Sequence, residues 1–142
     1  MTLKVVCTDY RGSEIPAAIA ARMGAGKHST YDVTVGAGYT AYAMALWASS
    51  PRPETPSGLH LLIVDDTGRP NWRPVELFDF SDRRIPDDWQ FRMVDGSGNV
   101  TALWGYASLI EDPHHHDDLI ERRNSALAAF LRDCGLESLA EA

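Results

Sequence analysis

The sequence predicts an α+β fold with mainly antiparallel strands, in which a sheet curls toward a small, partly open barrel and carries helices on one side. Short apolar runs with a period of two residues alternate with polar turns, which is typical of hairpins. Helical spacing dominates only the last third of the chain. The 142 residues, 44% of them hydrophobic, predict a single domain over 1–142.

The N-terminal part is expected to contain one strand and one short helix. Leu3–Thr8 is mostly apolar, as a strand of a core sheet would be. Ser13 can cap a brief helix in which Ile15, Ile19 and Met23 recur every four residues on one face. Glycines then end this helix.

Tyr31–Trp47 is the most ambiguous region. Asp32–Val35 alternates like a strand and is followed by a glycine turn. Tyr39–Trp47 alternates small and large apolar residues, which favours a strand buried on both faces, although its alanines would also suit a helix. Residues 49–58 contain three prolines and are expected to form an exposed loop.

The stretch Leu59–Phe80 is expected to form the hairpin around which the chain is organised. Leu61–Val64 is the first arm, and Asp-Asp-Thr-Gly at 65–68 is the turn. Val75–Phe80 is the return arm, with one irregularity at Phe78 that a bulge would explain. A lone hairpin is marginal in water, so the flanking segments are expected to complete the sheet.

A second hairpin and a terminal helix are expected in the rest of the chain. Trp89–Met93 and Val100–Tyr106 are the arms of the hairpin, joined by a glycine-rich turn at 95–99. One amphipathic helix then begins near Asp112-Pro113 and ends at Gly135, and residues 136–142 are expected to fray. One core is expected to unite Trp89, Phe91, Trp104, Leu127 and Phe130.

The formal net charge of −7 argues against nucleic acid or an anionic membrane as a partner, and it would steer a basic protein partner. No stretch approaches membrane-spanning length and the first residues lack a long apolar run, so the cytoplasm is the expected location. Cys7 and Cys134 are interpreted as small core residues, although a disulfide between the chain ends stays open.

Two groups of motifs resemble known proteins. Val33–Gly36 followed by Tyr39–Tyr42 resembles the opening of SH3-like barrels in small bacterial proteins. Asp65–Phe78 together with Leu103–Tyr106 resembles an uncharacterised group of such proteins, which is associated with immunity proteins that neutralise interbacterial toxins. The resemblance covers roughly residues 31–132 and its motifs are structural. It therefore implies a toxin domain as a protein partner and brings no active site.

A dinucleotide pattern offers an alternative function. Gly36, Gly38 and Ala41 match G-x-G-x-x-G/A after a strand-like run, and Asp65 stands where a ribose-binding acid is expected. A small enzyme or nucleotide-binding protein would then have its pocket near Gly36–Tyr42. The rest of the chain supplies hairpins and no further βαβ unit, so a glycine turn between strands is the favoured interpretation.

The three consecutive histidines at 114–116 are an alternative metal site. On a helix their side chains point about 100° apart and cannot converge on one ion. His114 and Asp118 can share a face, but a third ligand would have to come from elsewhere. A polar helix start is favoured. Because no Gly-x-Ser-x-Gly elbow occurs either, we expect no catalytic residues, no metal and no cofactor.

The sequence therefore predicts an acidic cytoplasmic binding protein, an immunity-type inhibitor of a toxin domain rather than an enzyme. The Trp-Arg segment that follows the first central strand is the expected contact surface, because aromatic and arginine side chains favour interfaces and carboxylates steer a basic partner. Its partner-binding residues are expected to be Asp65, Asp66, Arg69, Trp72, Arg73 and Glu76.

Overall fold

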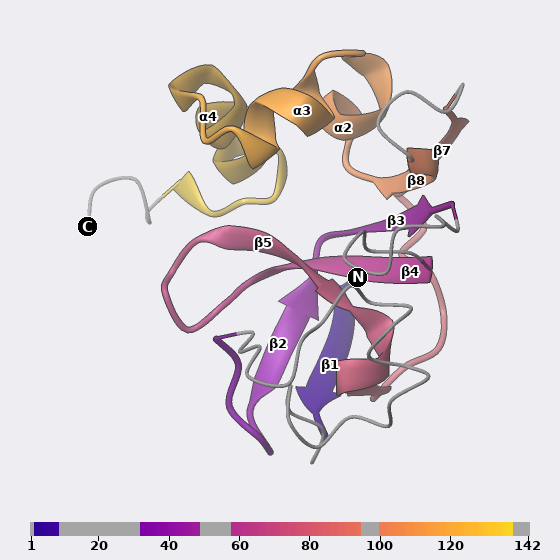
Figure 1. Ribbon diagram of the computed structural model, residues 1–142, viewed down its shortest axis with the longest axis vertical. Helices are drawn as coiled ribbons and strands as arrows, with labels where there is room; N and C mark the ends of the chain where they lie inside the picture. Colours follow the sequence, from indigo (N-terminus) through magenta and orange to yellow (C-terminus); the bar gives the residue numbers. More distant parts are fainter. Residues whose placement is uncertain (1, 9–31, 49–57, 95–99, 138–142) are drawn as a thin grey trace.

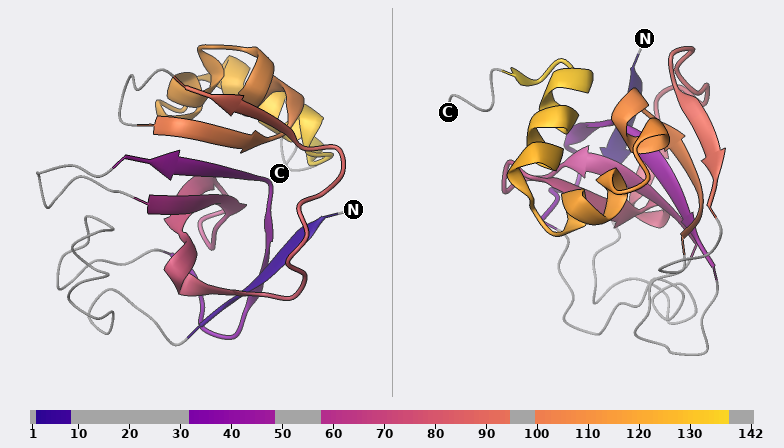
Figure 2. Two further views of the ribbon diagram at one scale, coloured as in Figure 1. Left: turned by 90° about the vertical axis from the view of Figure 1, so that its right-hand side faces the viewer. Right: turned by 90° about the horizontal axis from the view of Figure 1, so that it is seen from above.

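The computed structural model describes residues 2–8, 32–48, 58–94 and 100–137, which form an α+β fold of three stacked layers (Figure 1). Helices cover one face of a five-stranded sheet, and a three-stranded sheet lies against its other face (Figure 2). The described elements are β1 (Leu3–Cys7), β2 (Gly38–Ala41), β3 (Ala43–Trp47), β4 (Gly58–Val64), β5 (Pro70–Pro74), the 3-10 helix η1 (Val75–Leu77), β6 (Phe78–Phe80), β7 (Gln90–Met93), β8 (Val100–Gly105), α2 (Ala107–Glu111), α3 (His115–Ile120) and α4 (Asn124–Asp133).

All strand pairs in the described part of the chain are antiparallel, as predicted. The smaller sheet has the order β2-β1-β6 and the larger one β5-β4-β3-β8-β7. The chain passes from one sheet to the other at Tyr42, whose backbone N–H donates to the carbonyl of Leu62 at 2.8 Å. The ambiguous stretch 39–47 is thus extended, as favoured, but it forms two strands instead of one. The described strands do not close into a barrel.

Strand β4 is the centre of the fold because it is buried on both faces. Leu61 and Ile63 point toward the smaller sheet, and Leu62 points toward the helices. None of these three side chains is more than 1% exposed. Apolar residues at consecutive positions require cover on both sides of the sheet, so the sequence of β4 demands a three-layer arrangement.

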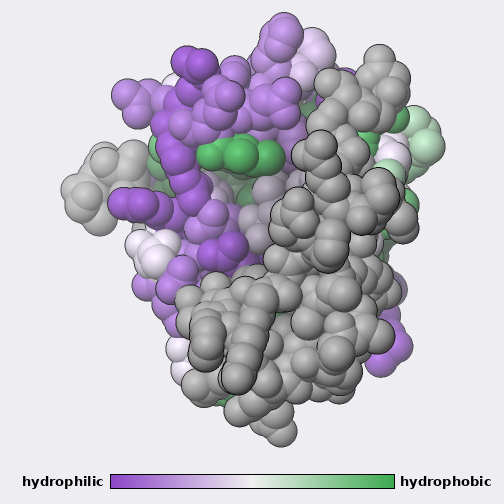
Figure 3. All heavy atoms as spheres, in the orientation of Figure 1, coloured by the Kyte–Doolittle hydropathy of each residue, from purple (hydrophilic) through white to green (hydrophobic). Residues whose placement is uncertain are grey.

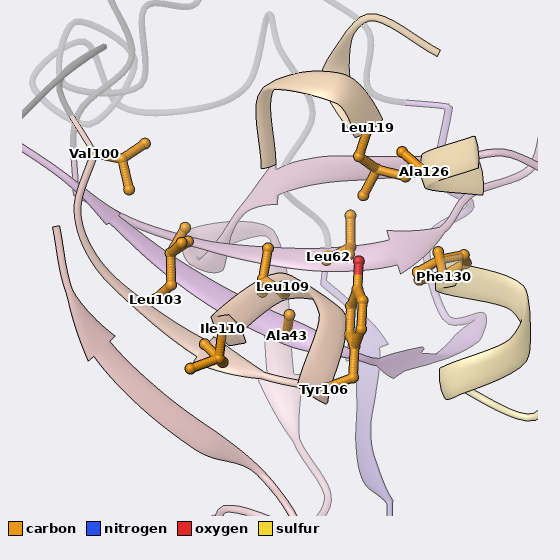
Figure 4. Close-up of a cluster of buried hydrophobic side chains, with 11 residues drawn as sticks. Ala43, Leu62, Val100, Leu103, Tyr106, Leu109, Ile110, Leu119, Ala126 and Phe130 are labelled. Carbon is orange, nitrogen blue, oxygen red and sulfur yellow. The ribbon is translucent and has the colours of Figure 1, made fainter. Parts of the chain in front are cut away.

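The two faces of β4 belong to two separate cores. The inter-sheet core holds alternate residues of β1, which is why Leu3, Val5 and Cys7 are all buried. The helix-side core lies between the larger sheet and the helices, and Figure 4 shows Leu62 directed toward Leu119 within it. Its buried members are Ala43, Ala45, Leu62, Val100, Leu103, Tyr106, Leu109, Ile110, Leu119, Ala126 and Phe130.

The expectation of one shared aromatic core is wrong. Trp89 packs on the inter-sheet core, whereas Phe130 and Leu127 belong to the helix-side core. Phe91 is 52% exposed. Strict alternation shows that one face of a strand is apolar, but it does not show whether that face meets the core or the solvent.

The return arm of the central hairpin is also different from the prediction. Strand β5 pairs with β4 from Val64↔Pro70 to His60↔Pro74. The predicted arm Val75–Phe80 instead forms η1 and then β6, which pairs with β1. Proline lacks an N–H and argues against a strand, but β5 lies at the edge of its sheet, where proline is tolerated.

The second hairpin is confirmed, with β7 and β8 as its two arms. The structure also shows why the last residue of β8 is a glycine. Gly105 has a φ of +152°, and a Cβ atom built there would lie 2.7 Å from the Cβ of Ala43. Any larger residue would therefore force β8 away from β3. The pairing of Gly105 with Ala43 depends on this close approach.

The predicted single C-terminal helix is divided into three in the described residues. Pro113 follows the end of α2, and Arg122, with a φ of +62°, separates α3 from α4. Gly135 has a φ of +70° just beyond α4, so the predicted glycine end is confirmed. Leu136 is not frayed as expected, because it packs on the helix-side core and its N–H donates to the carbonyl of Leu131 at 2.7 Å.

Several expectations fall outside the described residues. These are the N-terminal helix around 13–23, most of the proline loop at 49–58, the turn at 95–99 and the end of the tail at 138–142. Within the described residues, none of the helices combines the length and the apolar character that crossing a bilayer requires.

Phe130→Ala is expected to lower the free energy of unfolding by about 3–5 kcal/mol, because it opens a cavity in the helix-side core where Phe130 is completely buried. Ile120→Ala is the matched control in the same helical layer. It removes a side chain that is 52% exposed and should change stability by less than about 0.5 kcal/mol. Denaturant unfolding of both variants measures the difference. A loss below about 1 kcal/mol for Phe130→Ala would show that α4 is peripheral.

Candidate functional site

The first predicted partner residue, Asp65, is inside the protein. Its side chain is 0% exposed and lies at the end of β4. One carboxylate oxygen accepts hydrogen bonds from the backbone N–H of Thr67 at 3.0 Å and from the Thr67 hydroxyl. The other accepts from Asn71 Nδ2 at 2.7 Å and from an Arg73 guanidinium nitrogen at 2.8 Å. These contacts hold the turn after β4 in place.

The hydrogen bonds to Asp65 decide its charge. Burial alone raises the pKa of this carboxyl, because it disfavours the ionised form. The hydrogen bonds from Thr67 and Asn71 and the positive charge of Arg73 outweigh burial, so the pKa of Asp65 is lowered overall. Asp65 is therefore a buried anion with a complete set of donors.

Arg122 extends this cluster to the helical layer. Its guanidinium donates to the backbone carbonyl of Pro70 and to the side-chain oxygen of Asn71, both on β5. Arg122 adopts a left-handed backbone conformation, with a φ of +62°, and this turn lies between α3 and α4. We call Asp65, Asn71, Arg73 and Arg122 the Asp65 network. This network connects the end of β4 and strand β5 to the turn between α3 and α4. Its side chains form contacts within the protein.

Trp72, the expected aromatic anchor, also faces inward. It pairs with Leu62 across β4 and β5 and therefore shares its helix-side face. Its ring packs against those of Trp47 and His116, with centroids 5.5 and 5.7 Å apart. Trp72 is half-buried, and its Nε1 has no hydrogen-bond partner within the described ranges. Trp72 is part of the packing between sheet and helices.

The remaining predicted partner residues are more accessible. Asp66 and Arg69 are exposed, and Glu76 is half-buried. Asp66 accepts hydrogen bonds from the hydroxyls of Thr34 and Tyr39, each at 2.7 Å. The structure thus separates the six predicted residues into internal ones (Asp65, Trp72 and Arg73) and more accessible ones (Asp66, Arg69 and Glu76).

The histidines are not a polar helix start, because two of them are buried. His115 Nε2 lies 2.7 Å from the Tyr106 hydroxyl, and burial lowers the pKa of His115. His116 contacts Trp47 and Trp72, while His114 is exposed. Over the described ranges, no group of three or more His, Cys, Asp or Glu residues is arranged to hold a metal ion. The missed signal is the helical spacing of His115 and Leu119, which are both buried.

The glycines of the dinucleotide pattern form a turn. Gly36 has a φ of +83°, and its N–H donates to the carbonyl of Cys7. Gly38 begins β2, so no helix N-terminus follows where a pyrophosphate would bind. The carboxylate of Asp65 is occupied by Arg73 and is not directed to a ribose. Within the described residues, this turn therefore leads into a strand and lacks the helix start that the motif needs for binding a pyrophosphate.

The two cysteines are free thiols in different places. Cys7 is buried in the inter-sheet core, and Cys134 packs on the helix-side core. Burial raises the pKa of the Cys134 thiol to about 12, so it stays protonated and unreactive at neutral pH. Both behave as small apolar residues, as expected.

An exposed apolar surface lies at the opposite edge of the larger sheet from β5. Phe91 is 52% and Met93 68% exposed on β7, the edge strand. The Phe91 ring packs on that of Trp104, with centroids 5.1 Å apart. Leu46 is 38% exposed and lies on the same face of the sheet as Met93, because both residues pair with Ala102 of β8. We call Leu46, Phe91, Met93 and Trp104 the β7 patch.

Comparison with protein-family models, curated proteins and solved structures finds no match for this chain. The resemblance to SH3-like immunity proteins therefore stays a prediction. The features that bear on function are therefore the β7 patch and the charge of the chain.

Asp65→Asn should destabilise the protein at neutral pH by about 3 kcal/mol, because it removes one partner of a buried ion pair. The folded-state pKa of Asp65 lies below its unfolded value of about 4, so its contribution is complete above that pH and is lost as pH falls through the folded pKa. The stability gap between parent and variant should therefore narrow below about pH 4.

Urea unfolding between neutral and acidic pH measures this gap. Asp79→Asn, at an exposed position of β6, is the matched control and should change stability by less than about 0.5 kcal/mol. An Asp65→Asn variant as stable as the parent at neutral pH would show that the Asp65 network does not stabilise the fold.

Proposed function

We propose that this protein is an acidic immunity-type inhibitor that acts in the cytoplasm and neutralises a cognate toxin domain by binding it through the β7 patch. The observation that carries this proposal is the exposure of Phe91 and Met93 side by side on an edge strand. The SH3-like, partly open barrel that the resemblance implies belongs to the same proposal, and the stacked antiparallel sheets support it.

The composition of the β7 patch favours a protein interface. Aromatic residues and methionine are enriched at protein interfaces, and a few residues near the centre of an interface carry most of its binding energy. Phe91 already rests on Trp104 in the free protein, so less conformational freedom is lost when a partner covers it. The helical layer, in contrast, has a mainly hydrophilic surface in the view of Figure 3.

The charges next to the β7 patch favour a basic partner. Asp87 and Asp88 are exposed in the segment that leads directly into β7. Together with the net charge of −7, they would attract a positively charged surface and accelerate its encounter with the patch. We place the contact surface at the β7 patch and not at the Trp-Arg segment predicted from sequence, because the Asp65 and Trp72 side chains of that segment pack internally.

Combining Phe91→Ser with Met93→Ser should abolish protection against the toxin and leave the melting temperature unchanged, because both side chains are exposed in the free protein. The proposal expects a neighbouring reading frame whose expression is lethal without this chain. Growth of cells that express this frame with each variant is the measurement. Ile120→Ser, at 52% exposure in the helical layer, is the matched control and should protect fully. If no neighbouring frame is toxic, or if the parent chain gives no protection, the proposal fails.

Neutralising Asp87 and Asp88 with asparagine should slow association with the toxin by roughly tenfold at low salt and leave dissociation unchanged. The effect should disappear at high salt, because exposed charges are then screened. Stopped-flow binding at two ionic strengths measures it. Asp79→Asn with Glu121→Gln removes the same charge at exposed positions of other elements and should have a smaller effect. Equal slowing by both double variants would show that only net charge matters.

A further inference from the structure

The hydrogen-bond pattern of the β7–β8 hairpin shows which backbone groups of β7 face outward. The N–H of Val94 donates to the carbonyl of Thr101 at 2.9 Å, in register with the pairs of β7 and β8. Opposite residues in an antiparallel pair are hydrogen-bonded and non-hydrogen-bonded in turn. Arg92 therefore also bonds to β8, whereas the N–H and C=O groups of Phe91 and Met93 point away from it.

These outward backbone groups are available to another chain. Strand β7 is the last strand of its sheet, and no hydrogen bond to the N–H or C=O of Phe91 or Met93 is found among the described residues. The side chains of the same two residues are exposed and belong to the β7 patch. One short segment thus offers unpaired main-chain donors and acceptors together with apolar side chains, and an added β-strand uses both.

The opposite edge of the same sheet, β5, offers fewer such groups. The N–H of Asp65 donates to the carbonyl of Arg69 at 3.1 Å, in register with the pairs of β4 and β5. The same alternation therefore places Pro70, Trp72 and Pro74 at outward positions. Two of these residues are prolines, which lack an N–H. The carbonyls of Pro70 and Trp72 already accept hydrogen bonds from arginine side chains. The edge of the larger sheet that can accept a further strand is therefore β7.

Exposure and charge restrict the strand that fits. Among the described edge strands, only β7 carries large apolar side chains that are exposed. Asp87 and Asp88 are exposed directly before it. A second copy of this chain also has a net charge of −7 and is repelled, whereas a basic segment is attracted. The charges therefore favour a basic segment of another protein.

We propose that the toxin domain pairs an extended segment with β7, antiparallel to it, as a sixth strand of the larger sheet. This inference rests on the proposed function, because the toxin domain is the partner. The backbone of the segment exchanges hydrogen bonds with the N–H and C=O groups of Phe91 and Met93. Its apolar side chains, at alternate positions, cover the β7 patch. Basic residues at its C-terminal end lie next to Asp87 and Asp88, because the two strands are antiparallel.

Two substitutions of Met93 separate backbone pairing from side-chain contact. Met93→Ala removes the side chain and keeps the outward N–H, whereas Met93→Pro removes both. Calorimetry measures how each full-length variant binds the toxin domain that the neighbouring reading frame encodes. Met93→Pro should bind at least about tenfold more weakly than Met93→Ala, because it loses a hydrogen bond and its ring obstructs the added strand. Both variants should keep the parent's melting temperature, since proline is tolerated at a sheet edge.

Arg92 provides the matched control for the direction of the backbone groups. Its N–H points to β8, so Arg92→Pro should melt at a lower temperature than Arg92→Ala. If Met93→Pro lowers the melting temperature relative to Met93→Ala by the same amount, the N–H of Met93 is bonded inside the protein and the proposal fails.

Amide hydrogen exchange gives a measurement that needs no substitution. In the free chain the amides of Phe91 and Met93 should exchange rapidly and that of Arg92 slowly, because only Arg92 is bonded to β8. In the complex with the toxin domain, exchange at Phe91 and Met93 should slow by at least about tenfold. Unchanged exchange at both residues in the complex would overturn the proposal.

The outcomes distinguish this inference from the proposed function. If the parent chain binds the toxin domain and Met93→Pro binds as tightly as Met93→Ala, strand addition is wrong and the proposed function stands. If the parent chain binds no toxin domain, the proposed function fails and strand addition to a toxin fails with it. Sedimentation of the chain alone tests the other occupant. A dimer that Met93→Pro dissociates would identify a second copy as the added strand and overturn the choice of a toxin segment.

Discussion

The burial of β4 on both of its faces is the constraint on which the other described elements depend. Leu61 and Ile63 need the smaller sheet, and Leu62 needs the helices, so neither layer can be removed without exposing this strand. The end of β4 is fixed in a different way. There the buried Asp65 carboxylate is stabilised by donors from the turn and from β5, and Arg122 ties the same region to the helices. Apolar packing therefore determines the order of the layers, and the Asp65 network connects the larger sheet to the helices.

Much of the fold could be predicted because its signals are local. The turn signals around β7 and β8 and the alternation of β1 each report on neighbouring residues. The prediction failed where the decisive partner is distant in sequence. Pro70 and Pro74 argue against a strand until β5 is known to be an edge. Likewise, Arg122 interrupts the predicted helix because its backbone is in the left-handed region, and an arginine in the sequence does not predict this conformation.

Less of the candidate site could be predicted, because exposure is a tertiary property. The alternation of Phe91 and Arg92 is visible in the sequence, and it predicts that Phe91 faces the core because apolar side chains are usually buried. In the structure Phe91 is exposed instead. Trp72 was expected outside because it lies among prolines and arginines, yet its strand faces the helices. His116 looked like part of a solvated helix start, and only the packing of Trp47 and Trp72 around it reveals its burial.

The edge position of β7 also affects how the protein behaves at high concentration. In the described part of the chain no strand pairs with the free edge of β7. A free edge with apolar side chains is a template for pairing with other chains. Asp87 and Asp88 stand directly before it and act as gatekeepers, because charges flanking an apolar strand oppose such pairing. The sequence pI is about 5.1, so mild acid removes the mutual repulsion that keeps the molecules apart. The colloidal stability of the protein is therefore lowest in mildly acidic solution.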